Sequence, residues 1–221
     1  MTVLAAASLV DVFKQLEPVF EEANPGADVQ FSFGGSSDLA QQIVNGAPAD
    51  VFASANKKQM SVVSDAQLVE GAAKVFTTNV LTIVVPKDNP KGIKTFADLA
   101  APDVTEVVCA PQVPCGAATE QIEKSTGVTL SPASEELDVR AVLAKVTTGE
   151  ADAGLVYLTD ARSAKDQVVQ IDFPEARNAI NEYFIAALQE APQPQHAKAF
   201  VDFILGPDGQ QALKDAGFGT P

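Results

Sequence analysis

The sequence is poor in the residues that most catalytic and metal sites require. Its 221 residues include one histidine, two cysteines and no tryptophan. The histidine, His196, lies far along the chain from the serine-bearing turns described below, and we expect it on the surface. The sequence has no cluster with the spacing of metal ligands and no G-x-S-x-G nucleophile motif. It also shows no pair of carboxylates placed for acid–base catalysis. The sequence therefore predicts a protein that is not an enzyme and that needs no cofactor or bound metal cation.

Positive charge is also scarce. The chain has 15 lysines and arginines against 29 aspartates and glutamates, which gives a net charge of −14. A nucleic-acid-binding protein needs a basic face to neutralise phosphates, and an anionic membrane surface attracts basic segments. The charge therefore argues against both partners. Long apolar runs are absent too, since none approaches the ~20 residues that span a bilayer.

The two cysteines, Cys109 and Cys115, are separated by five residues. This spacing is unsuited to zinc, and no further cysteine or nearby histidine completes a ligand set. Two interpretations remain, namely buried free thiols or a disulfide that closes a small loop and fits an oxidising compartment. Pro111 and Pro114 favour a tight loop between the cysteines, so we predict the disulfide.

Short apolar runs alternate with amphipathic segments along the whole chain, of which 46% is hydrophobic. Predicted strands cover residues 3–6, 28–33, 50–53, 80–85, 107–110, 153–157, 168–171 and 183–188. Predicted helices cover residues 9–23, 36–44, 57–66, 95–99, 115–126, 139–148, 159–164, 194–205 and 207–216. The alternation predicts an α/β fold with mostly parallel sheets flanked by helices. The number of strands is high for one sheet, so two smaller sheets fit better.

Four junctions place small or hydroxyl residues at the start of a helix: A-A-A-S at 5–8, G-G-S-S at 34–37, V-P-C-G at 113–116 and L-D-V-R at 137–140. The first turn of a helix carries N–H groups without intrahelical acceptors, and small residues let a ligand approach them. Such ends bind anions without a charged side chain. The ordinary alternative is that Ser8, Ser36 and Ser37 are N-caps. The four junctions together favour a site for a small anion.

The sequence around these junctions resembles the molybdate-binding proteins of ABC transporters. The resemblance rests on A-A-A-S-L at 5–9, G-G-S-S-D-L-A-Q-Q-I at 34–43, G-A-P-A-D-V-F-A-S-A at 46–55, V-P-C-G at 113–116, D-V-R at 138–140, G-L-V-Y at 154–157 and the segment 206–218. The motifs follow in order from residue 3 to residue 218. The segment 46–55 is the most distinctive of them.

The resemblance implies a two-lobed periplasmic-binding-protein fold (type II) with the ligand in the cleft between the lobes. We expect one lobe to comprise residues 1–80 and 183–221, and the other residues 81–182. The first lobe would supply hydroxyl and backbone donors from Ser8 and Ser36. The second would supply backbone N–H groups from Cys115 and Val139 and the phenol of Tyr157. Arg140 is expected to make no direct contact.

A site made only of donors favours an anion that carries no proton, such as molybdate, tungstate or sulfate. The resemblance implies molybdate, and tungstate with it, and a membrane permease as the partner of a monomeric binding protein. It also implies export to the periplasm or cell surface, with any signal peptide removed and a lipid anchor as one form of attachment. Two alternatives stay open. One is a sulfate-type binding protein, and the other is the effector-sensing domain of a transcription regulator, which the lack of a basic N-terminal segment disfavours.

Overall fold

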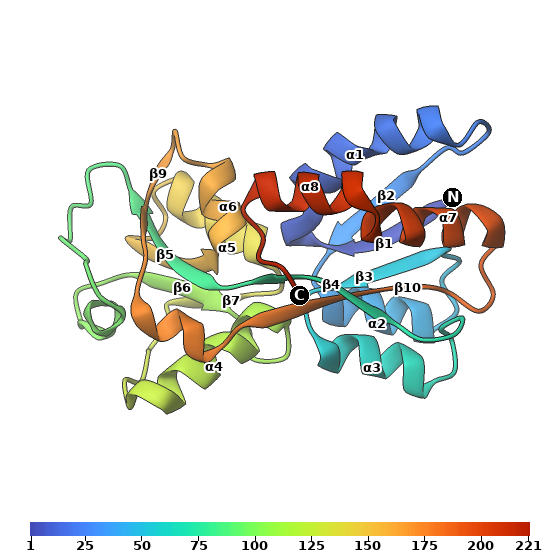
Figure 1. Ribbon diagram of the computed structural model, residues 1–221. Helices are drawn as coiled ribbons and strands as arrows, with labels where there is room; N and C mark the ends of the chain where they lie inside the picture. Colours follow the sequence, from blue (N-terminus) through green and yellow to red (C-terminus); the bar gives the residue numbers. More distant parts are fainter. The chain divides into compact units, whose positions relative to one another are not determined.

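The computed structural model describes residues 1–221, and the contacts between its residues divide the chain into two compact units. One unit comprises Met1–Thr78 and Glu182–Pro221, and the other Asn79–Asn181. Each unit is built on one five-stranded sheet with helices against it (Figure 1). The α/β fold class with two sheets is therefore confirmed. None of the helices combines the length and the apolar composition that crossing a membrane requires.

The sheet of the first unit has the strand order β2-β1-β3-β10-β4. The central strand β1 (Thr2–Ala6) runs parallel to β2 (Gln30–Gly34) and to β3 (Val51–Ser54). Strand β10 (Asn181–Ala187) returns antiparallel to β3, and β4 (Lys74–Asn79) forms the edge. The helices of this unit are η1 (Ala7–Leu9), α1 (Val10–Ala23), α2 (Ser36–Val44), α3 (Lys57–Asp65), α7 (Pro194–Leu205) and α8 (Pro207–Ala216).

The sheet of the second unit has the order β7-β6-β8-β5-β9. Strands β7 (Ser134–Glu136), β6 (Glu106–Cys109) and β8 (Ala153–Tyr157) are neighbours and run parallel. Strand β5 (Leu81–Pro86) is antiparallel to β8 and to β9 (Val168–Ile171). The helices are η2 (Phe96–Ala100), α4 (Pro114–Thr126), α5 (Val139–Thr147), α6 (Leu158–Ser163) and η3 (Pro174–Asn178).

The first sheet is buried on both faces, which holds its strand ends in place. Val3 and Ala5 of β1 belong to one hydrophobic cluster, together with Phe13 of α1 and Phe200 of α7. Leu4, between them in sequence, belongs to a second cluster, which includes residues of α2 and α3. Successive residues of a strand point to opposite faces, so α1 and α7 cover one face of the sheet and α2 and α3 the other.

Two strands, β4 and β7, were not predicted, and both sheets are mixed where mostly parallel sheets were expected. Only Val80 separates β4 from β5, and no glycine or proline marks a boundary there. The sequence pattern therefore predicts only one strand here, over residues 80–85. In the structure, β4 belongs to the sheet of the first unit and β5 to the sheet of the second. The antiparallel strands β10 and β5 make each sheet mixed.

Candidate functional site

The predicted donors of the first unit lie where parallel strands end. Because β1, β2 and β3 are parallel neighbours, their carboxyl ends share one edge of the sheet. Ser8 follows β1 in η1, and Ser36 follows β2 as the first residue of α2. The backbone N–H of Ala55, just after β3, donates to Ser36 Oγ over 3.0 Å. Ser8 and Ser36 therefore belong to the same edge.

Ser36 is not the N-cap of its helix. Gly35 occupies that position, and the Ser36 oxygen accepts a hydrogen bond from Ala55 rather than from the first turn of α2. Only 1% of the residue is exposed. Since the oxygen already accepts from the protein, the hydroxyl proton is available for a ligand. The N-cap alternative considered for this serine was wrong.

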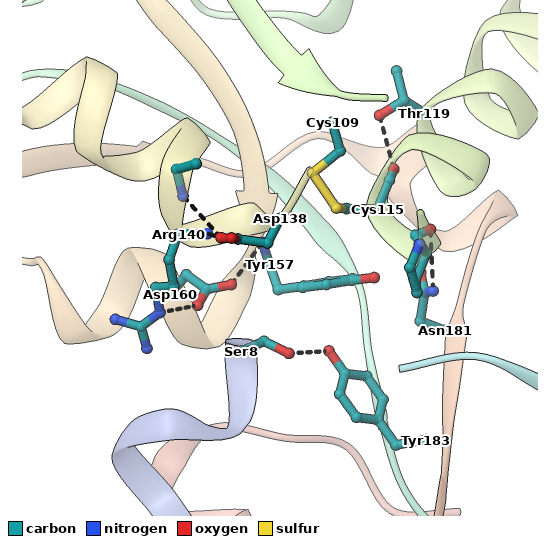
Figure 2. Close-up of a disulfide and its surroundings, with 12 residues drawn as sticks. Ser8, Cys109, Cys115, Thr119, Asp138, Arg140, Tyr157, Asp160, Asn181 and Tyr183 are labelled. Atoms are coloured by element: carbon teal, nitrogen blue, oxygen red, sulfur yellow. Dashed lines mark hydrogen bonds and ion pairs between the residues drawn. A yellow bond between two sulfur atoms is a disulfide. The ribbon is translucent and has the colours of Figure 1, made fainter. Parts of the chain in front are cut away.

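Ser8 makes a different buried contact. Its Oγ lies 2.8 Å from the phenol oxygen of Tyr183 on β10 (Figure 2), and both residues are buried. Its side chain caps no helix, because the N-cap of η1 is Ala6 and that of α1 is Leu9. Both serines are thus held by groups outside their own helices. Neither serine side chain acts as a helix cap, and their roles as ligand donors stay predictions.

The predicted donors of the second unit share an edge for the same reason. Strands β7, β6 and β8 are parallel neighbours, so their carboxyl ends lie together. Tyr157 is the last residue of β8, and only 1% of it is exposed. Cys115 is the second residue of α4, and Val139 is the first residue of α5. Their roles as ligand donors stay predictions.

The start of α5 is capped by Asp138, the aspartate of the L-D-V-R junction. Its Oδ1 accepts hydrogen bonds from the N–H groups of Arg140 and Ala141, over 2.8 Å and 3.0 Å. These are the second and third N–H groups of the helix. The first, that of Val139, has no intrahelical acceptor. Asp138 therefore accepts from the N–H groups of Arg140 and Ala141 but not from that of Val139. The Val139 N–H is the group that the resemblance predicts as a ligand donor.

The predicted disulfide between Cys109 and Cys115 is confirmed, with an S–S distance of 2.08 Å. It ties the last residue of β6 to the first turn of α4 (Figure 2). The next residue, Gly116, lies so close to the preceding turn that a Cβ atom would stand 1.9 Å from the Ala110 carbonyl oxygen. The backbone at the start of α4 is thus fixed from two sides.

Asp160 connects two of the predicted donor segments. This carboxylate is fully buried, and its Oδ1 lies 2.8 Å from Arg140 Nε (Figure 2). Its Oδ2 accepts a hydrogen bond from the Tyr157 backbone N–H over 3.2 Å. The Arg140 guanidinium is therefore paired with a carboxylate of the protein.

Sequence reasoning missed Asp160, Tyr183 and a third candidate, Ser37. The Oγ atom of Ser37 is buried at the start of α2 without a hydrogen-bond partner, whereas its place in the sequence indicates only the start of a helix. An acidic residue in the first turn of the short helix α6 was a usable signal for Asp160. No local signal identified Tyr183, because its contact with Ser8 joins residues 175 positions apart.

The most distinctive motif of the sequence, G-A-P-A-D, lies at the other end of the strands. Asp50 precedes β3 and is almost completely buried. Its two carboxylate oxygens accept hydrogen bonds from the N–H groups of Thr2, at the start of β1, and Gln193, before α7. Its role is therefore to fasten the amino ends of strands to the loop before α7.

Comparison with known proteins identifies the family to which this chain belongs. A family model described as bacterial extracellular solute-binding protein matches residues 1–219. The chain belongs to this family. Among solute-binding proteins, the molybdate-binding protein of Mycobacterium tuberculosis (strain H37Rv) is 48% identical over 221 residues, which are 100% of this chain and 85% of that protein. The sulfate-binding protein of Synechococcus elongatus is 25% identical over 252 residues, and the match covers 99% of this chain and 72% of that protein.

The fold of this solute-binding chain also matches that of a solved relative. The periplasmic molybdate-binding protein of Azotobacter vinelandii aligns with a TM-score of 0.86 at 23% identity, covering 100% of this chain and 99% of that one. At this identity, the likeness supports the fold alone. It agrees with two mixed sheets flanked by helices.

Proposed function

We propose that this solute-binding protein captures molybdate, and tungstate with it, outside the cytoplasm and delivers it to the membrane permease of an ABC transporter. The observation that carries the proposal is the donor arrangement at the carboxyl ends of the parallel strands in each unit. Uncharged donors stand at each of these edges, and the neighbouring arginine, Arg140, is paired with Asp160. The 48% identity to a protein named as molybdate-binding supports molybdate over sulfate.

In this proposal the two units act as two lobes, residues 1–80 with 183–221 and residues 81–182, that share one oxyanion between them. Ser8 and Ser36 donate from the first lobe. The backbone N–H groups of Cys115 and Val139 and the phenol of Tyr157 donate from the second. The buried, unpartnered Ser37 hydroxyl is a further candidate donor of the first lobe. The ligand is released chemically unchanged, and the protein works as a monomer.

The energies suffice for such a site. Burying a dianion is prohibitively costly unless it is hydrogen-bonded, and a hydrogen bond to a charged group contributes about 1.5–3 kcal/mol net. Each helix end adds about 0.3–1 kcal/mol. Five donors and several helix ends therefore reach the ~8–12 kcal/mol of micromolar to nanomolar binding. The net charge of −14 opposes capture only weakly, because salt screens it beyond about 8–10 Å.

Isothermal titration with molybdate, tungstate, sulfate and phosphate tests the proposal. We expect tight binding of the first two and weak binding of the others. Ser36→Ala should weaken molybdate binding by about tenfold or more, since it removes one charge-assisted donor. Ser32→Ala is the matched control, because Ser32 is an exposed serine on the strand before the same turn. Tight binding of sulfate alone would favour the sulfate-type alternative, and equal effects of the two variants would place the site elsewhere.

A further inference from the structure

The hydroxyl groups of Ser8 and Tyr183 form a buried pair whose geometry is set by the fold. Their oxygens are 2.8 Å apart, and 3% of Ser8 and none of Tyr183 is exposed. The Tyr183 ring is packed edge-on against Phe76 at 6.2 Å and against Phe218 at 5.6 Å between ring centres. Edge-on aromatic contacts of this kind fix a ring in the core. The phenol oxygen therefore has little freedom to move away from Ser8.

The direction of the hydrogen bond between Ser8 and Tyr183 decides what Ser8 can offer a ligand. Each hydroxyl has one proton and two lone pairs, and only one proton can lie between the two oxygens. If Ser8 donates to Tyr183, it has no proton left for an anion. If Tyr183 donates to Ser8, the serine proton is free to bind the anion. A fully deprotonated oxyanion only accepts hydrogen bonds, so its presence selects the second arrangement.

Ser36 shows the same principle without ambiguity. Its oxygen accepts from the backbone N–H of Ala55, a group that can only donate. A donor of the fold thus occupies the Ser36 oxygen, and the geometry allows Tyr183 to do the same at Ser8. Serine hydroxyls are otherwise adaptable, since they can donate to one ligand and accept from another. Here both serines would be held as donors.

We infer that Tyr183 is a positioning residue that sets the anion selectivity of this site, by donating its phenol proton to Ser8 and so leaving the Ser8 proton to point toward the ligand. The inference rests on the proposed function. A singly protonated oxyanion such as hydrogen phosphate brings a proton that needs an acceptor. When the Tyr183 phenol donates its proton to Ser8, the Ser8 hydroxyl points its own proton, and not a lone pair, toward the ligand. Tyr183 therefore discriminates between deprotonated and protonated oxyanions without touching either.

The test compares affinities for molybdate and for phosphate at pH 7 in the wild type, Tyr183→Phe, Ser8→Ala and the double variant. Tyr183→Phe frees the Ser8 hydroxyl to rotate and present a lone pair. We expect about a tenfold loss of molybdate affinity, a smaller change or a gain for phosphate, and hence a fall of several-fold in the ratio of the two affinities. In the Ser8→Ala background, Tyr183→Phe should change neither affinity further.

Thr77→Val is the matched control. Thr77 is buried on β4 next to Phe76, and its hydroxyl donates to the Gly219 carbonyl over 2.7 Å, so the variant also removes one buried hydroxyl near the same aromatic cluster. Thermal unfolding of both variants measures the general cost of that loss. Thr77→Val should leave the molybdate-to-phosphate ratio unchanged. An equal shift of the ratio in both variants would overturn the selectivity role of Tyr183.

A second variant carries 3,5-difluorotyrosine at position 183, which keeps the aromatic ring and the hydrogen bond to Ser8. The same two affinities are measured. The more acidic phenol of this variant is a stronger donor, so the molybdate-to-phosphate ratio should rise. A ratio that stays constant in this variant and in Tyr183→Phe, while Ser8→Ala weakens molybdate binding, would overturn the inference alone. If Ser8→Ala leaves molybdate binding intact, the proposed ligand set itself is wrong.

Discussion

Arg140 Nε lies 2.8 Å from Asp160 Oδ1, and this ion pair joins the first turn of α5 to the segment that follows β8. The aspartate is fully buried, whereas 27% of the arginine side chain is exposed. The second oxygen of the same carboxylate accepts the Tyr157 backbone N–H. The Asp160 carboxylate thus holds the backbone of Tyr157, a proposed ligand residue. It also holds the side chain of Arg140, which follows the proposed ligand residue Val139.

Arg140→Met should destabilise the protein, because it leaves the Asp160 carboxylate buried without its counter-ion. Removing one partner of a buried pair costs about 3–5 kcal/mol, and partial exposure of the arginine reduces this to about 2–3 kcal/mol. Urea unfolding of the variant measures the loss. Arg162→Met is the control, since Arg162 is exposed on α6, and it should stay within about 0.5 kcal/mol of the wild type. Equal losses in the two variants would show that the pair contributes nothing.

The environment of the Glu106 carboxyl makes the stability of the protein depend on pH. The Glu106 side chain is buried at the start of β6, Oε1 accepts the Ser131 N–H over 2.7 Å, and Oε2 has no hydrogen-bond partner. Burial raises the pKa of this carboxyl from 4.5 to about 7, and the nearby Glu123 carboxylate acts in the same direction. The folded protein therefore binds this proton more tightly than the unfolded chain does. The stability that the proton confers is present below pH ~4.5 and is lost as the pH rises through about 7.

Glu106→Gln should remove this pH dependence. The free energy of unfolding of the wild type relative to the variant should fall between pH 5 and pH 8, by at most about 3 kcal/mol. The carboxyls of Asp98 and Glu136 have lowered pKa values, through hydrogen bonds from the Lys94 backbone and the Lys145 side chain respectively, and so act at lower pH. Glu22→Gln, at an exposed position, should track the wild type. A constant difference between wild type and Glu106→Gln would contradict the assignment.

The Cys109–Cys115 disulfide should add about 2 kcal/mol of stability, the value expected for so short a closed loop. Replacing both cysteines by serine should lower the unfolding midpoint accordingly. Because the bond holds the first turn of α4, we also expect weaker molybdate binding. Adding a reducing agent to the double variant should change nothing, whereas the wild type should lose stability. If reduction lowers the midpoint of both proteins equally, the effect does not come from this bond.

Gly116→Ala should be among the most damaging single substitutions. The new Cβ would meet the Ala110 carbonyl oxygen at 1.9 Å, which forces the start of α4 away from the end of β6. We expect a loss of several kcal/mol of stability or insoluble protein, as measured by thermal unfolding and soluble yield. Gly34→Ala is the comparison, because its Cβ would meet only the Leu39 side chain at 3.6 Å. Similar yields and midpoints would mean that the turn can relax.

Local sequence patterns were sufficient for most helices. Asp138 and Thr95 begin their helices as N-caps, and Gly127 ends α4 with a φ of +73°. These features depend on a few consecutive residues, so the sequence carries them directly. The same holds for the disulfide, since a tight loop with two prolines brings its cysteines together. The boundary between β4 and β5 was missed, because their separation depends on which sheet each strand joins.

The sequence by itself determined that the chain is an acidic α/β protein with helix-start junctions suited to an anion, and it marked Ser8, Ser36, Cys115, Val139 and Tyr157. Only the tertiary structure decided how those residues are held. The Ser8–Tyr183 contact spans 175 positions, and the Ser36 oxygen accepts from the end of a different strand. Such contacts follow from strand order and register, which no local pattern specifies. The junction motifs favour an anion site, but the packing of distant strands determines which groups hold the two serine hydroxyls.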